Sequence, residues 1–140
     1  MSVAEILLPL FVQVGLTFVL MFWMASLRVG AIRRGDVKMR EIALRQPWPE
    51  RAQQISNAFH NQLELPLLFY AVVAFAMLTK GDDGLMIILA WIYVAFRYLQ
   101  AFVHATYNKI VHRFGAFVVS VIVLAIMWVH LFLHVASAAI

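Results

Sequence analysis

The sequence predicts an all-α integral membrane protein, a bundle of four transmembrane helices in a single domain over residues 1–140. Two observations support this prediction. Of the 140 residues, 64% are apolar and 13% are charged, whereas a soluble domain is about half apolar and about a quarter charged. Uncharged stretches also reach the roughly 20 residues that a transmembrane helix needs. A chain this short cannot bury so much apolar surface in water, which excludes a soluble globule and a disordered chain.

The two clearest spans lie near the ends of the chain. Residues 6–27 and residues 114–140 contain no Asp, Glu, Lys or Arg. The segment MSVAE, which precedes the first run, contains no basic residue, and a signal peptide has a basic N-terminal region. We therefore expect the first run to be a transmembrane helix rather than a cleaved leader.

Two further spans are expected in the middle of the chain. Residues 65–79 and 85–96 are strongly apolar but too short to cross a bilayer alone, so each must extend into a polar neighbour. Pro66 predicts a kink in the second helix, because proline frees the carbonyl four residues earlier. The four helices are expected at about 5–30, 55–79, 84–110 and 114–138.

Basic residues gather in two of the three loops, and this asymmetry predicts the orientation. Cytoplasmic loops carry an excess of Lys and Arg, so we expect the first and third loops inside and both termini outside the cytoplasm. The second loop, TKGDDG, has one Lys against two Asp. The basic residues of the first and third loops are Arg28, Arg33, Arg34, Lys38, Arg40, Arg45, Arg51, Lys109 and Arg113.

Polar side chains recur with helical spacing on the second and third helices. Such groups at membrane depth usually face the interior of the bundle. We expect Glu64 and Arg97 to meet there, because pairing offsets the cost of burying both charges. Arg28 and Arg113 flank the same level, which predicts a cationic pocket suited to an anionic ligand. The two stripes are Asn57, His60, Asn61 and Glu64, and Arg97, Gln100, His104, Tyr107 and Asn108.

Some features have a plainer interpretation. A Glu64–Arg97 pair also serves to lock two helices together, as polar groups do in membranes. His130 and His134 lie four residues apart at the other end of the bundle, without a nearby carboxylate in sequence, so we expect packing or interfacial histidines and no metal site. The net charge of +4 comes without a nucleic-acid-binding motif, so no nucleic-acid partner is expected.

Two segments resemble the MAPEG superfamily, the membrane-associated proteins in eicosanoid and glutathione metabolism, and in particular its bacterial branch. The first is SNAFHNQLELPLLFY, with Asn61, Glu64 and Pro66, and the second is FRYLQAFVHATYNKIVHRFGAF, from Arg97 to Arg113. The resemblance implies a homotrimer in the bacterial inner membrane, with glutathione as cosubstrate at the subunit interfaces. Membrane lipids and a lipophilic small-molecule substrate are the other partners that it implies.

The resemblance also implies roles for individual residues. The implied glutathione-binding residues are Asn61, Glu64, Arg97, Asn57 and Tyr107. The implied catalytic residues are Arg113, Arg28 and His104. Arg113 would favour the thiolate of glutathione, with Arg28 as the alternate cation and His104 as a hydrogen-bond donor or acid. The predicted function is a membrane-bound glutathione-dependent transferase or peroxidase that acts on lipophilic electrophiles.

Two positions depart from the family's pattern and leave other functions open. Many glutathione-using members have Arg where this chain has Asn57, and the place of a usual Tyr on the third helix holds Phe102 or His104. The main alternative is a non-catalytic lipid-binding or scaffold protein on the same fold. A structural subunit of a larger complex also stays open. A transporter is disfavoured, because the outer halves of the last three helices are almost wholly apolar.

Overall fold

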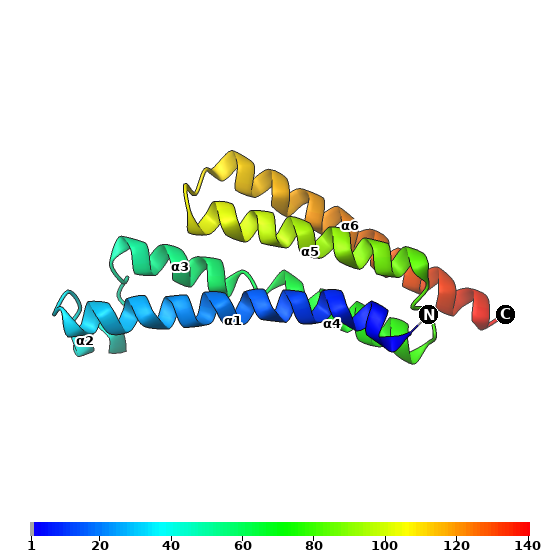
Figure 1. The fold of residues 1–140 in the computed structure, drawn as a ribbon, viewed down its shortest axis with the longest axis horizontal. Coiled ribbons are helices and arrows are strands. Elements are labelled where there is room, and N and C mark those ends of the chain that lie inside the picture. Colours follow the sequence, from blue (N-terminus) through cyan, green and yellow to red (C-terminus); the bar gives the residue numbers. More distant parts are fainter. Residues whose placement is uncertain (1) are drawn as a thin grey trace.

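The computed structural model describes residues 2–140 as an elongated bundle of helices (Figure 1). No strand occurs in this part of the chain. α1 lies along α3 and α4, and α5 and α6 form the other long pair. The helices are α1 (Val3–Arg33), α2 (Met39–Ala43), α3 (Glu50–His60), α4 (Leu65–Leu78), α5 (Gly84–Ala105) and α6 (Ile110–Ala138).

Four segments are long and apolar enough to cross a membrane. Three of them are α1, α5 and α6, and the fourth, Glu50–Leu78, combines α3 and α4. Between 28% and 50% of the most apolar stretch of each span is buried inside the protein, so much of the apolar surface faces outward. Helices suit the hydrocarbon core of a membrane because all their backbone hydrogen bonds are internal. The chain is thus an all-α integral membrane protein, as its composition predicts.

The second span is divided into two helices, which corrects the expectation of one helix over residues 55–79. α3 ends at His60, and two tight turns follow, in which the amides of Gln62 and Leu63 donate to carbonyls three residues earlier. α4 then begins at Leu65 with Pro66 in its first turn. Proline has no amide hydrogen and its ring clashes with the carbonyl four residues back, so a continuous helix is kinked or broken at this point.

The turn between α5 and α6 also differs from the expected helix ends. α5 ends at Ala105 rather than near residue 110, and α6 begins at Ile110 rather than near residue 114. Asn108 adopts the left-handed region at φ 51°, and its amide donates to the carbonyl of Val103 at 2.7 Å. Asparagine tolerates this conformation better than most residues and therefore serves to end helices.

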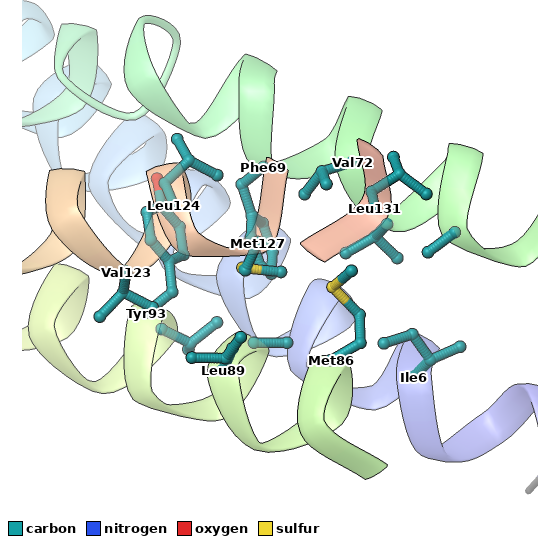
Figure 2. Close-up of a cluster of buried hydrophobic side chains, with 14 residues drawn as sticks. Ile6, Phe69, Val72, Met86, Leu89, Tyr93, Val123, Leu124, Met127 and Leu131 are labelled. Carbon is teal, nitrogen blue, oxygen red and sulfur yellow. The ribbon is translucent and has the colours of Figure 1, made fainter. Parts of the chain in front are cut away.

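The main apolar core lies where α1, α4, α5 and α6 meet, in the half of the bundle near the two termini (Figure 2). At its centre the rings of Phe69 and Tyr93 stack with centroids 4.5 Å apart. Two smaller clusters continue toward the other end, and both draw on α1, α3 and α5 without a residue from α6. The start of α6, ahead of Val119, therefore belongs to none of these clusters and lies beside the polar residues described next.

Candidate functional site

Arg97, on α5, is the largest of the fully buried side chains, with 1% of its surface exposed. Its guanidinium donates to the carbonyl oxygen of Asn61 at 2.8 Å and to the side-chain oxygen of Gln100 at 2.6 Å. A third, longer bond of 3.4 Å reaches the side-chain oxygen of Gln62. The Asn61 carbonyl lies at the end of α3, where carbonyls lack helical partners. Neutral oxygens therefore surround this cation.

The network extends to α1 through two glutamines. Gln13 is fully buried and donates to the side-chain oxygen of Gln62 at 2.9 Å, and Gln62 in turn donates to the carbonyl of Ala58 at 3.1 Å. The sequence analysis missed both side chains as parts of the site. Gln13 carried a signal, since it is the one amide side chain in the apolar run of residues 6–27, and isolated polar groups at membrane depth usually have a partner.

A hollow of 280 Å³ lies beside this network, between the α3–α4 break and the start of α6. Two charged side chains line it, Glu64 and Arg113. Nη1 of Arg113 donates to the side-chain oxygen of Asn108 at 2.9 Å, so the left-handed turn positions this guanidinium. The remaining lining residues are Asn61, Gln100, Ile110, Phe114 and Phe117. A carboxylate, a guanidinium and two amides thus share a small space with an apolar wall.

His104 lies behind Asn61 and is itself buried, with 5% of its surface exposed. Its Nδ1 is 3.2 Å from the amide nitrogen of Asn61. An amide nitrogen donates, so His104 accepts through Nδ1 in this arrangement. The contact fixes the orientation of the Asn61 side chain at the edge of the hollow, and His104 is not among the residues that line it.

The expected Glu64–Arg97 ion pair is absent, which corrects the sequence analysis. Within residues 2–140 the ion pairs are Arg34–Asp36 and His130–Asp83. The α3–α4 break turns the Asn61 carbonyl toward Arg97 and leaves the Glu64 side chain exposed at the hollow. The expectation assumed a continuous helix, on which Asn61 and Glu64 would share one face.

Several other predicted site residues lie outside the hollow. Arg28 donates to the hydroxyl of Ser56 at 2.9 Å and sits 4.8 Å from the centre of the Trp48 ring. Asn57 is exposed and accepts a bond of 2.9 Å from Gln53. The remaining predicted residues of this group are His60, bonded to the Ser56 carbonyl, and Tyr107, bonded to His112. The structure therefore joins Asn61, Glu64 and Arg113 but separates them from Arg28 and Asn57.

His130 and His134 on α6 contact the turn between α4 and α5. Nε2 of His130 lies 2.8 Å from a carboxylate oxygen of Asp83, and Nε2 of His134 lies 3.0 Å from the carbonyl of Thr79. Across residues 2–140, no three His, Cys, Asp or Glu side chains gather as metal ligands would. Both histidines thus join α6 to this turn by polar contacts, and the turn brings to His130 a carboxylate that is distant in sequence.

The comparisons with known proteins give one finding. A model of the MAPEG family matches residues 6–133 of the 140. The chain belongs to the MAPEG family. No curated protein and no solved structure matches this MAPEG chain. The family assignment extends across all four spans and confirms the resemblance carried by the Asn61–Pro66 and Arg97–Arg113 segments.

At the family level, MAPEG membership supports glutathione-related transferase or peroxidase activity in membranes. The hollow fits glutathione in its chemistry, since Arg113 suits a carboxylate, Glu64 suits an ammonium group, and Asn61 and Gln100 suit peptide amides. Its volume of 280 Å³ falls just below the range of about 300–1,000 Å³ for small-molecule sites. The hollow of one subunit is therefore at the lower limit of a small-molecule site.

Proposed function

We propose that the protein is a membrane-bound glutathione-dependent transferase or peroxidase that acts on lipophilic electrophiles. The observation that supports this most directly is the hollow in which Arg113 and Glu64 lie beside the amides of Asn61 and Gln100. The site opens next to an apolar wall from α6, and a substrate dissolved in the bilayer can approach along such a wall.

In this proposal Asn61, Gln100 and Glu64 hold glutathione. Their amide groups bond to its peptide units, and the Glu64 carboxylate takes its ammonium group. Arg97 is then a positioning residue rather than a ligand contact. Its bonds to the Asn61 carbonyl and the Gln100 side chain fix two of the groups that line the hollow.

Arg113 supplies the cation that the reaction needs. The chain has no cysteine, so the reacting sulfur is that of glutathione, and a thiolate is the nucleophilic form of sulfur. A guanidinium near the sulfur favours its charged form. The bond to Asn108 keeps Arg113 at the hollow, whereas Arg28 stacks on Trp48 and does not line it. We therefore assign the thiolate-stabilising role to Arg113 rather than to Arg28.

A homotrimer completes the proposed site. The hollow is small, and its apolar wall includes Ile110 and Phe114, which are 69% and 61% exposed in the isolated chain. A second subunit against this half of α6 would enlarge the polar site and cover the wall. We further propose the bacterial inner membrane as its location, with both termini outside the cytoplasm, from the family resemblance and the positions of the basic residues.

A non-catalytic lipid-binding protein is the second candidate. Two residues implied as glutathione ligands lie away from the hollow, since Asn57 bonds to Gln53 and Tyr107 bonds to His112. The glutathione-binding set that the family pattern implies is therefore incomplete within one subunit. This reading predicts a tightly held lipid and no glutathione thiolate.

The test is glutathione binding to the detergent-purified protein, measured by calorimetry and by ultraviolet difference absorbance of the thiolate. We expect binding with a thiolate band in the wild type. A nearby opposite charge shifts a pKa by about 1–3 units. At pH values below the pKa of the glutathione thiol, Arg113→Ala should therefore reduce the thiolate fraction about tenfold or more. Arg113→Lys should retain most of the band, because it keeps the charge.

Lys109→Ala is the matched control, since Lys109 is an exposed cation on the same turn that does not line the hollow. We expect it to bind and ionise glutathione as the wild type does, with the same oligomeric mass. An unchanged thiolate band in Arg113→Ala would contradict the role of Arg113. No binding at millimolar glutathione would favour the lipid-binding candidate, which mass spectrometry of co-purified lipids would then test.

A further inference from the structure

A second hollow, of 340 Å³, lies on the outside of the bundle between α1 and α5. It shares no lining residue with the hollow beside Arg113. Its lining side chains are apolar except for the indole N–H of Trp23 and two hydroxyls. Both hydroxyls donate to backbone carbonyls, Tyr98 to Val12 at 2.7 Å and Thr106 to Phe102 at 2.6 Å. The groove is lined by Leu16, Val19, Leu20, Trp23, Tyr98, Ala101, Phe102, Ala105 and Thr106.

The dimensions and chemistry of this groove suit an acyl chain. One wall runs along α5 from Tyr98 to Thr106, the residue after the helix end, and these nine residues cover about 12 Å at 1.5 Å per step. Because the hydroxyls at both ends are bonded within the protein, the groove offers little to a polar metabolite. It offers apolar contact along the membrane normal, which is how lipid chains lie.

Arg51 lies at the end of the groove nearest the α1–α3 loop. Its guanidinium carbon is 4.9 Å from the centre of the Trp23 ring, and it donates to the carbonyl of Ala105. Both of these residues line the groove. A further bond of 3.2 Å joins Arg51 to the side-chain oxygen of Gln54. These contacts hold a cation at the mouth of an apolar groove.

No carboxylate neutralises this cation in residues 2–140, since their two ion pairs, Arg34–Asp36 and His130–Asp83, do not include Arg51. Both of its protein acceptors bond to Nη1, whereas a guanidinium has five donors in a planar fork that matches phosphate. Trp23 beside it is a residue type enriched at the headgroup level of membranes. The charge and the free donors of Arg51 therefore suit a lipid headgroup.

We propose that this groove binds one anionic phospholipid of the bilayer, with an acyl chain along α1 and α5 and the phosphate at Arg51. The site is separate from the proposed glutathione site and does not depend on catalysis. It would fix the α1–α5 contact at the end of the bundle where the core clusters are small.

The test uses brominated lipids, which quench tryptophan fluorescence on contact. A variant that retains only Trp23 (Trp48→Phe, Trp91→Phe and Trp128→Phe) is reconstituted in phosphatidylcholine vesicles. Brominated phosphatidylglycerol or brominated phosphatidylcholine is then added in steps. We expect brominated phosphatidylglycerol to reach half-maximal quenching at a mole fraction about fivefold lower than brominated phosphatidylcholine does. This factor corresponds to about 1 kcal/mol for one cation at an anionic surface.

Three variants separate the role of Arg51 from general charge. Arg51→Gln should abolish the preference for phosphatidylglycerol, and Arg51→Lys, which keeps the charge but not the planar fork, should retain part of it. Arg33→Gln, the matched control, removes an exposed cation at the end of α1 and should retain the full preference. Equal quenching by the two lipids in the presence of Arg51 would overturn the proposal. So would an equal loss in Arg33→Gln, or the same loss in Arg51→Lys as in Arg51→Gln.

Native mass spectrometry gives a second measurement on the chain with all four tryptophans. After delipidation in detergent and addition of phosphatidylglycerol, the wild type and Arg33→Gln should each retain one lipid per subunit that Arg51→Gln loses. Retention of that lipid by Arg51→Gln would overturn the proposal.

Discussion

Arg97 shows why a buried cation does not require a carboxylate partner. Two amide side chains and one backbone carbonyl accept from it, and a bond between a charged donor and a neutral acceptor is among the stronger hydrogen bonds. The sequence analysis favoured Glu64 as the partner of Arg97 because a charged residue can be identified from the sequence alone. The free carbonyl of Asn61 is not visible there, since it depends on where α3 ends.

Arg97→Met should destabilise the protein, because it leaves the acceptors of Asn61 and Gln100 buried without a donor. We expect the free energy of unfolding to fall by about 1–3 kcal/mol, measured by thermal unfolding in detergent with Arg33→Met as the exposed control. A variant that keeps full stability but no longer binds glutathione would contradict the positioning role and indicate a direct ligand contact.

Asp83 predicts a pH dependence at the end of the bundle that carries the two termini. Burial raises the pKa of its carboxyl, but the amide of Met86 and the His130 ring outweigh this and hold the pKa below its usual range. Because the folded-state pKa is the lower one, this stabilisation is complete above the unfolded-state value of about 4 and is lost as pH falls through the lowered pKa.

Asp83→Asn should therefore reduce stability at neutral pH and converge with the wild type below about pH 4. The side chain is half exposed, so we expect a difference of less than about 1 kcal/mol. Thermal unfolding across pH 3–7 measures it. Asp82→Asn is the neighbouring control, with no hydrogen bond to α6, and an equal effect there would contradict the specific role of Asp83.

At the scale of elements, the division of the second span is the feature that shapes the site. α3 and α4 are separate helices, and the residues between them supply Asn61, Gln62 and Glu64 to the network and the hollow. Non-helical backbone at membrane depth is tolerated where protein or a polar cavity surrounds it. Arg97 and the hollow provide those surroundings.

Pro66→Ala tests the origin of the break. Alanine restores an amide and removes the ring clash, so the segment from residue 61 to 65 should gain helical hydrogen bonds. We expect the amide hydrogens of this segment to exchange about tenfold more slowly than in the wild type, because tenfold corresponds to the typical net free energy of one hydrogen bond. Hydrogen-exchange mass spectrometry measures this rate. Unchanged exchange would indicate that Arg97, rather than Pro66, maintains the break.

The four spans were predictable because run length and charge alone decide whether a helix can cross a bilayer. The helix ends were less so. Pro66 predicted a kink, but a full break also requires the capture of the Asn61 carbonyl by Arg97, which is a contact between distant segments. The end of α5 depends on the left-handed conformation of Asn108. The residue type alone does not determine whether the backbone takes this conformation, so the helix end could not be predicted.

At the scale of the whole molecule, both termini and the α4–α5 turn lie at one end, and the basic loop with α2 lies at the other (Figure 1). Asn61, Glu64 and Arg113, which the sequence places at one level of the bundle, line the same hollow. Arg28 was expected at that level too but does not line the hollow, because depth along a helix says nothing of the direction in which a side chain faces. Gln13 was overlooked, since it lies in the span that carries no charge.

The predicted orientation is testable because the chain has no cysteine. In intact bacterial cells, a membrane-impermeant maleimide should label Ser137→Cys, near the C-terminus, and should label Arg45→Cys, in the basic loop, only after permeabilisation. The two single-cysteine variants serve as controls for each other. The reverse pattern would place the termini in the cytoplasm.

The break in the second span also has a consequence for solvation. Backbone groups released between α3 and α4 need hydrogen-bond partners, and hydrocarbon offers none. The hollow beside them must therefore be hydrated, so that water reaches the level of Glu64 from the end of the bundle that carries the basic loop. A hydrophobic molecule that diffuses in the bilayer would meet this water beside the apolar side chains of Ile110, Phe114 and Phe117.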